Sequence, residues 1–168
     1  MQIVDYASLQ DAIASWLNRS DLAARIPDFI GLAETWMMRK LRLRLMEADA
    51  AMTGVVGSRF ITLPTDYQEP LNLWWNNGSD REPLRFVAPA LIDVWTANGH
   101  PYQWAIDGTK VAFERPCDQA YSFTFRYRQK LALSTGTPTN VLLTAYPDIY
   151  LFASLAEAAP YLKDKDAQ

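Results

Sequence analysis

Cysteine and histidine are almost missing from this 168-residue sequence, in which Cys117 is the single cysteine and His100 the single histidine. A lone cysteine excludes an internal disulfide. One cysteine and one histidine also cannot supply a cluster with the spacing of zinc ligands. We therefore expect no metal site and no cofactor, and the disulfide-stapled and zinc-finger classes of small protein are excluded.

Long apolar runs are missing as well. No stretch approaches the roughly 20 apolar residues that a membrane-spanning helix needs. The beginning of the chain, MQIVDYASLQDAIASW, lacks the basic start, the apolar segment and the small-residue cleavage site of a signal peptide. We expect a soluble protein that is synthesised in the cytosol and has no membrane partner.

Positive charge is in short supply. Lys and Arg number 16 against 19 Asp and Glu, which gives a formal net charge of −3. Because neutralising a phosphate backbone needs a surplus of cations, a protein whose main task is binding nucleic acid is disfavoured.

Hydrophobic residues make up 49% of the chain. That is enough to bury one real core, and we expect a single domain over residues 1–168.

Aromatic residues, in contrast, are abundant, with six Trp, eight Tyr and seven Phe. One small core does not need so many large rings. We expect some of them at subunit interfaces, where large amphipathic side chains are enriched.

Apolar residues recur at helical spacing in three segments, and Trp16 and Trp36 belong to the first two apolar faces. Ser8 is typical of a helix start, and Pro27 suits the first position of the second helix. Pro160 is expected to kink or end the last helix, because its ring removes a backbone donor. The pattern predicts helices at about residues 8–18, 27–41 and 147–162.

The last helix is expected to pack on the second. Its small residues Ala153, Ala156 and Ala159 would let another helix approach closely, and Leu155 is assigned to the packing layer. The second helix ends in a basic cluster, which we interpret as a solvated helix end where cations complement the helix dipole. This cluster consists of Arg39, Lys40, Arg42 and Arg44.

Short apolar segments alternate with turn residues at about residues 45–130 and predict a β-rich lobe. Asp107-Gly108 fits a two-residue turn in a hairpin over residues 102–114. Residues 121–128 alternate aromatic and polar side chains, which indicates a half-buried strand. Residues 89–98 predict a short helix within the lobe.

Helices and strands are thus segregated along the chain, which favours an α+β fold over alternating α/β. We expect a helical bundle formed by the N-terminal helices and the C-terminal helix, with a central antiparallel β lobe.

The residues that could carry nucleophilic catalysis stand in unpromising contexts. His100, the single imidazole, lies in the turn-like segment Asn98-Gly99-His100-Pro101, an unpromising context for the base of a catalytic triad. Cys117 follows a proline in a strand-to-strand turn, with no helix start nearby to lower the pKa of its thiol. We expect both to be bystanders and assign no catalytic residue.

Carboxylates and glycines give no specific motif either. A hydrolase could use two of five candidate acids, but their spacing specifies no pair. Gly54 and Gly57 lack the further glycine or lysine that a phosphate-binding loop requires. The candidate acids are Glu47, Asp49, Asp66, Glu69 and Asp93.

Tryptophans offer the sharpest alternative. A stacking platform for a sugar or a base could be built from rings in the lobe, although a core or a subunit interface is the more common use of such rings. A sugar-binding platform would need at least two coplanar, exposed rings in one groove. The candidates are Trp74, Trp75, Trp95 and Trp104.

A series of short motifs resembles the phage head-tail adaptor or connector proteins, which also occur in gene transfer agents. The motifs follow the family's order over nearly the whole chain and consist of folding residues rather than an active site. They lie at residues 16–22, 26–30, 33–34, 39–42, 63–67 and 83–84, at Tyr127 with Leu131, and at 147–151 and 155–162.

The resemblance implies a non-enzymatic structural subunit of the virion, located in the neck between head and tail. It implies a ring of about twelve copies that binds the portal protein and a downstream tail or stopper protein. Double-stranded DNA would pass through the ring without specific binding. The family's members continue beyond residues 161–164 with a tail that reaches the portal, so portal-binding residues stay unassigned. A carbohydrate-binding or cell-wall-hydrolase tail component that uses the Trp-rich lobe is the alternative.

Overall fold

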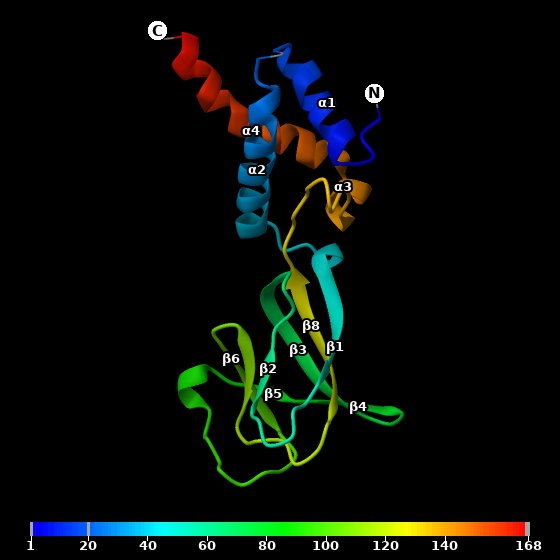
Figure 1. Cartoon of the computed structure of the whole chain (residues 1–168), viewed down its shortest axis with the longest axis vertical. Helices are drawn as coiled ribbons and strands as arrows, with labels where there is room; N and C mark the ends of the chain where they lie inside the picture. Colours follow the sequence, from blue (N-terminus) through cyan, green and yellow to red (C-terminus); the bar gives the residue numbers. More distant parts are fainter. Residues whose placement is uncertain (1, 20, 167–168) are drawn as a thin grey trace. The chain divides into compact units, whose positions relative to one another are not determined.

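The computed structural model describes residues 2–19 and 21–166 and divides the chain into two compact units. The helical unit combines Met1–Met46 with Lys130–Gln168, and the β unit is Glu47–Gln129. The β unit is therefore an insertion between the second and third helices of the helical unit (Figure 1).

Helices begin and end in the helical unit close to the predicted residues. The element order is α1 (Tyr6–Leu17), η1 (Ala23–Arg25), α2 (Ile26–Lys40), η2 (Arg44–Met46), α3 (Val141–Ala145) and α4 (Pro147–Asp166). The start of α1 differs from the prediction, because Asp5 caps the helix and its Oδ1 accepts a hydrogen bond of 2.8 Å from the Ser8 backbone N–H. Ser8 is the third residue of the helix and completes a capping box.

Pro160 does not end α4, which continues to Asp166. The proline ring deprives the Ala156 carbonyl of its usual donor. Both residues are exposed on the same side of the helix, so water can satisfy that carbonyl. The helix therefore tolerates a residue that the sequence pattern treats as a stop.

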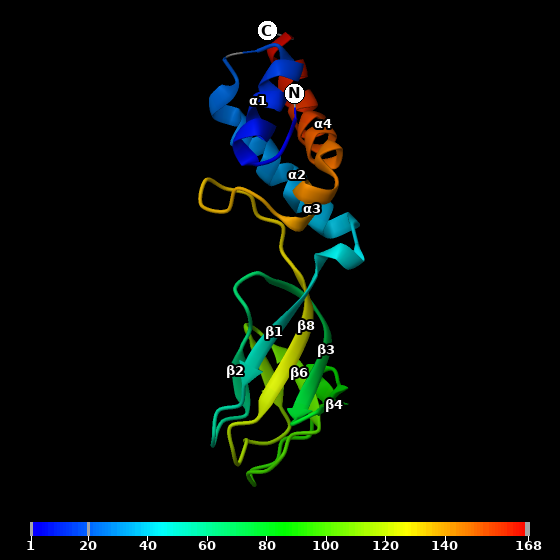
Figure 2. The ribbon, with the colours of Figure 1, turned by 90° about the vertical axis from the view of Figure 1, so that its right-hand side faces the viewer.

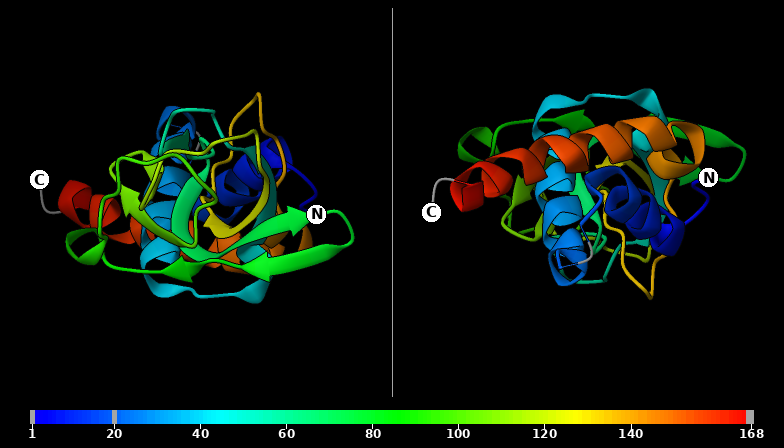
Figure 3. Two further views of the ribbon diagram at one scale, coloured as in Figure 1. Left: turned by 90° about the horizontal axis from the view of Figure 1, so that it is seen from below. Right: turned by 90° about the horizontal axis from the view of Figure 1, so that it is seen from above.

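Residues from all four α-helices pack into the core of the helical unit, and Figure 3 shows α4 running across both α1 and α2. The Phe29 and Tyr161 rings, on α2 and α4, lie 5.7 Å apart, which confirms the predicted pairing of these helices. The core residues of this unit are Leu9, Ala12, Ile13, Ile26, Ile30, Ala33, Met37, Met46, Leu131, Leu133, Leu142, Leu143, Tyr150 and Leu151.

The detailed assignment of the α4 packing face was partly wrong. Ser154 and Ala158 are the fully buried small residues of α4, whereas Ala156 and Ala159 are exposed and Ala153 is half-buried. Leu155 is partly buried and packs against the core, as predicted. The actual contact face is rotated from the predicted one because it follows Tyr150 and Leu151 rather than the alanines.

A buried hydrogen-bond network joins three segments of the helical unit. Glu34 is 7% exposed, and its Oε1 accepts hydrogen bonds from the Leu133 backbone N–H at 2.8 Å and from the Tyr150 hydroxyl at 2.9 Å. Asn140, the N-cap of α3, donates to the same Tyr150 hydroxyl. Burial raises the pKa of the Glu34 carboxyl, because the charged form loses its hydration.

Within the described residues, the strands of the β unit form two sheets, ordered β1-β8-β3-β4 and β2-β7-β6-β5. The pairs are antiparallel except for β5 with β6. In Figure 2, β8 lies between β1 and β3. The strands are β1 (Glu47–Thr53), β2 (Phe60–Thr62), β3 (Tyr67–Asn77), β4 (Asp80–Pro83), β5 (Arg85–Phe86), β6 (Gln103–Asp107), β7 (Lys110–Phe113) and β8 (Ser122–Gln129).

An aromatic-rich core fills the β unit and draws on both sheets. The predicted alternation in β8 is confirmed, since Phe123, Phe125 and Tyr127 are buried and the polar residues between them are not. The predicted β6–β7 hairpin is present, but Asp107 pairs with Lys110, so its two-residue turn is Gly108-Thr109 and not Asp107-Gly108. Gly108 has φ +58°, a left-handed conformation that glycine adopts freely.

Two segments of the β unit differ from expectation. Residues 89–98 contain only the short η3 (Pro89–Leu91) and otherwise form a loop. The strand β1 was not recognised in the sequence. The α+β class is confirmed, with helices from both ends of the chain flanking a largely antiparallel β region. Among the described helices, none is both long enough and apolar enough to cross a membrane.

Candidate functional site

The helix α4 carries almost no charge along most of its length. Between residues 149 and 162 the single Asp, Glu, Lys or Arg is Glu157. The side that faces the core is buried, yet the opposite side is also largely apolar and lies exposed. A helix that is apolar on all sides is normally buried on all sides. We define the α4 outer face as Asp148, Phe152, Ala156, Ala159 and Pro160, all of which are exposed.

Exposed aromatic rings lie on and beside the α4 outer face. Trp16 of α1 is 62% exposed and Phe152 is 54% exposed, and their rings meet edge to face at 5.6 Å. Trp36 of α2, 48% exposed, borders a hollow of about 210 Å³ together with Ala153 and Ala156. Grouped apolar side chains of this size on a surface mark a protein contact.

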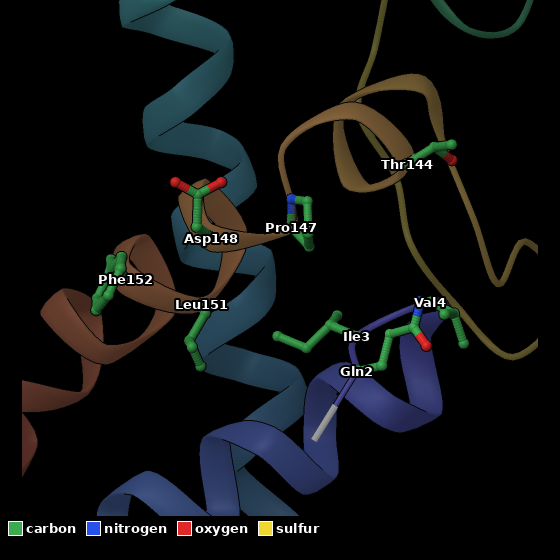
Figure 4. A pocket seen from close by; sticks show the side chains of 8 residues that line it. All are labelled: Gln2, Ile3, Val4, Thr144, Pro147, Asp148, Leu151 and Phe152. Carbon is green, nitrogen blue, oxygen red and sulfur yellow. The ribbon is translucent and has the colours of Figure 1, made fainter.

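A groove of about 610 Å³ lies beside Phe152 (Figure 4). Ile3 and Val4 of the N-terminal segment form one wall, and the first turns of α4 form the other. Asp148 lies at its rim in the first turn of α4, where the helix dipole favours a negative charge. The groove is therefore apolar with an acidic edge.

His100 occupies an aromatic cage in the β unit. Its ring lies 4.1 Å from the Trp75 ring, 4.8 Å from Tyr121 and 4.9 Å from Tyr102. Both ring nitrogens are buried, and no residue in the described part of the chain hydrogen-bonds to them. Burial lowers the pKa of His100, and nearby acids such as Glu82 offset this only in part. The cage holds a packed, neutral imidazole.

Stability of the β unit is expected to fall as the pH drops below about 6.5, the ordinary pKa of histidine. In that range the unfolded chain takes up a proton at His100 that the folded chain, with its lowered pKa, resists, so the unfolded state binds more protons. Denaturant unfolding at pH 7.5 and pH 5.5 measures this. His100→Phe keeps the ring packing and should lose less stability over the same interval. Equal losses in the two proteins would contradict the assignment.

Cys117 is fully buried. Burial raises the pKa of its thiol to about 11, with nearby Asp118 adding to the effect. Its backbone carbonyl accepts a hydrogen bond from Gly57, and its sulfur packs where a side chain at Gly54 would have to go. The thiol is a packing group, and Gly54 and Gly57 serve the same turn rather than a phosphate loop.

The candidate carboxylates brace the sheets. Arg126 donates two hydrogen bonds to Asp49, at 2.7 and 2.9 Å, and this interaction lowers the pKa of the Asp49 carboxyl. The Tyr127 hydroxyl donates to Asp66 at 2.8 Å. Glu69 pairs with Arg128 on the neighbouring strand. The remaining two are Glu47, at the start of β1, and Asp93, in the exposed loop after η3.

The four tryptophans of the lobe, all in the described part of the chain, do not share one surface. Trp104 is 1% exposed, and its Nε1 donates to the Leu84 carbonyl at 3.2 Å. Trp75 contacts the His100 cage, while Trp74, the preceding residue of β3, points to the opposite face of the sheet. Trp95 lies 4.4 Å beneath the Arg115 guanidinium. A stacking platform for a sugar needs at least two coplanar, exposed rings in one groove, and these four rings do not provide it.

Metal chemistry finds no support in the geometry, since the described residues include no group of three or more His, Cys, Asp or Glu side chains able to hold an ion. The exposed apolar side chains of α1, α2 and α4 stay as a candidate contact surface. The model of the SU10 adaptor protein family matches residues 4–168. The chain belongs to the SU10 adaptor protein family. A search of curated proteins gives no match.

Membership in the SU10 adaptor family makes the chain a phage adaptor, a structural component of the virion. The match covers both units and includes all the residues on which the resemblance rests. A structural adaptor works through protein contacts. The α4 outer face with its flanking rings is thus the surface of this SU10 adaptor that best fits such a role.

The basic cluster of the SU10 adaptor is exposed at the end of α2, as predicted. The Arg42 guanidinium donates to the Met38 carbonyl at 3.4 Å, which helps to satisfy the last turn of the helix. Arg39, Lys40 and Arg44 project from the same region. The cluster places positive charge on the helical unit, while the α4 outer face carries negative charge.

The α4 outer face and the exposed rings beside it were not identified from the sequence of the SU10 adaptor. Trp16 and Trp36 follow the helical spacing and were assigned to core faces, but each lies at the border of its apolar stripe, and they are 62% and 48% exposed. The available signal was the scarcity of charge in residues 149–162, where Glu157 is the single charged residue. A helix of that composition needs cover on both sides.

Proposed function

We propose that this SU10 adaptor is a subunit of the neck of a tailed-phage or phage-like particle, such as a gene transfer agent. There it forms a ring that joins the portal protein to the tail and surrounds the channel through which double-stranded DNA leaves the head. The observation that carries the proposal is the family match over residues 4–168. A ring of about twelve copies would match the symmetry of a portal ring.

Exposed apolar side chains support a role in assembly. A ring subunit needs surfaces for two neighbours, for the portal and for the next tail component. Trp16 and Phe152 expose more than half of their surface in the helical unit, and Val94 and Trp95 do so in the β unit. Both units thus offer contact surfaces. We propose that they act together as one adaptor domain.

The charge balance supports passage of DNA without binding. The chain carries a net charge of −3, so a ring of such subunits has no overall surplus of cations. A wall that does not bind phosphates does not arrest the DNA. The portal, the tail or stopper protein and a second copy of this chain are the proposed protein partners.

Light scattering of the purified chain with the portal protein of the same particle tests the proposal. We expect a complex whose mass equals a portal ring plus several adaptor copies. The chain with an unrelated protein of similar size is the control and should show two separate masses. If the adaptor and the portal also stay separate at micromolar concentrations, the proposed joining role is wrong.

A further inference from the structure

Gly31 has no role inside its own subunit. It lies in the middle of α2, on the exposed side, and a Cβ atom built there meets nothing within 4 Å. Its φ is not positive, so the backbone does not require glycine. Glycine in a helix interior is less stable than alanine. A helix that carries this cost without an internal reason has a surface where another backbone can approach closely.

The neighbours of Gly31 form a stripe along α2. Leu32 is 52% exposed, the Thr35 hydroxyl hydrogen-bonds back to the Gly31 carbonyl, and Arg39 is exposed two turns further on. We call Gly31, Leu32, Thr35 and Arg39 the α2 outer stripe. It is small and apolar at one end and positively charged at the other.

We propose that the α2 outer stripe of one copy docks on the α4 outer face of a second copy. This inference rests on the proposed ring and names the surfaces that join its neighbours. The α4 outer face has a large ring, Phe152, beside the small Ala156 and Ala159. The small side chain of Ala156 lets the backbone at Gly31 approach closely, while Phe152, one turn away, can pack against the part of the stripe near Thr35.

Charge complementarity selects a second copy as the occupant. From residue 141 to 162 the chain has no Lys or Arg, and the acidic Asp148 lies at one end of the α4 outer face. A second α4 outer face offers no base to pair with Asp148, whereas the α2 outer stripe brings Arg39. Neither Asp148 nor Arg39 forms an ion pair with another residue in the described part of its own chain.

Spacing along the two helices matches when they run antiparallel. Gly31 and Arg39 are eight residues apart, and so are Asp148 and Ala156, which corresponds to about 12 Å on each helix. With Gly31 opposite Ala156, Arg39 lies opposite Asp148. The two surfaces differ, so the contact is head-to-tail, and repetition of such a contact builds a ring when the rotation between copies closes.

Gly31→Ala gives the first test, because it should act in opposite directions on folding and on association. The denaturant midpoint of the monomer should rise, since alanine favours the helix. Self-association, measured as mass against concentration with and without the portal protein, should weaken by about tenfold or more, because a methyl group keeps the helices apart. Phe152→Ser should weaken association similarly, and Leu91→Ser, at an exposed leucine of the β unit, should leave it unchanged.

Charge reversal gives the second test. Asp148→Arg and Arg39→Glu should each prevent association when present in every copy. A mixture of the two variants should restore it, because each contact between unlike copies then joins opposite charges. The portal protein is the same in every mixture. Recovery on mixing therefore shows that the two charges meet between adaptor copies and not between the adaptor and the portal.

The outcomes distinguish this inference from the proposed function. Rings that form normally with Gly31→Ala and Phe152→Ser would leave the adaptor role intact and overturn the α2–α4 contact. Loss of portal binding in the single variants without recovery in the mixture would assign the α4 outer face to the portal and also overturn it. A wild-type chain that neither self-associates nor binds the portal would contradict the proposed function itself.

Discussion

Phe125→Ala is expected to destabilise the β unit by about 3 to 5 kcal/mol, the usual loss when a buried phenylalanine is truncated. Phe125 is fully buried in β8, and its ring lies 5.4 Å from Tyr127, 5.8 Å from Trp104 and 5.9 Å from Tyr67. These rings come from both sheets. The cavity would therefore separate the sheets at the centre of their shared core. Urea unfolding followed by tryptophan fluorescence measures the loss.

Phe86→Ala is the matched control. Phe86 also packs against Trp104, at 4.7 Å, but it is 51% exposed. Its truncation removes little buried surface and should cost about 1 kcal/mol or less. Equal losses at the two positions would mean that the centre of the core lies elsewhere.

The sequence predicts Phe125 well because its signal is local. Residues 121–128 alternate without interruption, and a period of two assigns every second ring to the core. The β6–β7 hairpin, apart from a shift of its turn by one residue, and the three long helices are likewise predicted by patterns that fit within one element. The α+β class follows from their order along the chain.

The strand β1 could not be predicted in the same way. Its sequence, Glu-Ala-Asp-Ala-Ala-Met-Thr, has no aromatic residue and a single β-branched one, so its intrinsic preference for a strand is weak. It is a strand because each of its seven residues pairs with β8. Such pairing depends on residues 69 to 81 positions away, which no local pattern records.

The sequence predicts contact surfaces with aromatic rings, but it does not locate the α4 outer face. The excess of aromatic residues predicts rings at subunit interfaces, and the rings singled out for a stacking platform lie in the lobe, at Trp74, Trp75, Trp95 and Trp104. The proposed contact surface, the α4 outer face, instead contains Phe152 and lies beside Trp16. These two rings meet because α1 packs against α4. The helical period assigns a side chain to a stripe, but the position of the neighbouring helix decides whether a residue at the border of that stripe is covered.

Glu34→Ala is expected to destabilise the helical unit by about 3 kcal/mol. The substitution leaves two buried donors without an acceptor, the Leu133 backbone N–H and the Tyr150 hydroxyl, and each unpaired buried group costs about 1 to 3 kcal/mol. Loss of the network also loosens Asn140, which caps α3. Denaturant unfolding followed by circular dichroism at 222 nm, where helices dominate, measures the change.

Glu34→Gln separates the hydrogen bonds from the charge. The amide oxygen can accept from both donors, so stability at pH 7 should stay within about 1 kcal/mol of the wild type. Burial raises the folded-state pKa of Glu34 above 4.5, so the wild type is most stabilised at low pH, where the carboxyl is protonated, and loses that contribution as the pH rises through the folded-state pKa. The glutamine variant lacks this loss and should gain on the wild type between pH 4 and pH 7. A constant difference over that range would show that Glu34 titrates normally and that the network does not exclude water.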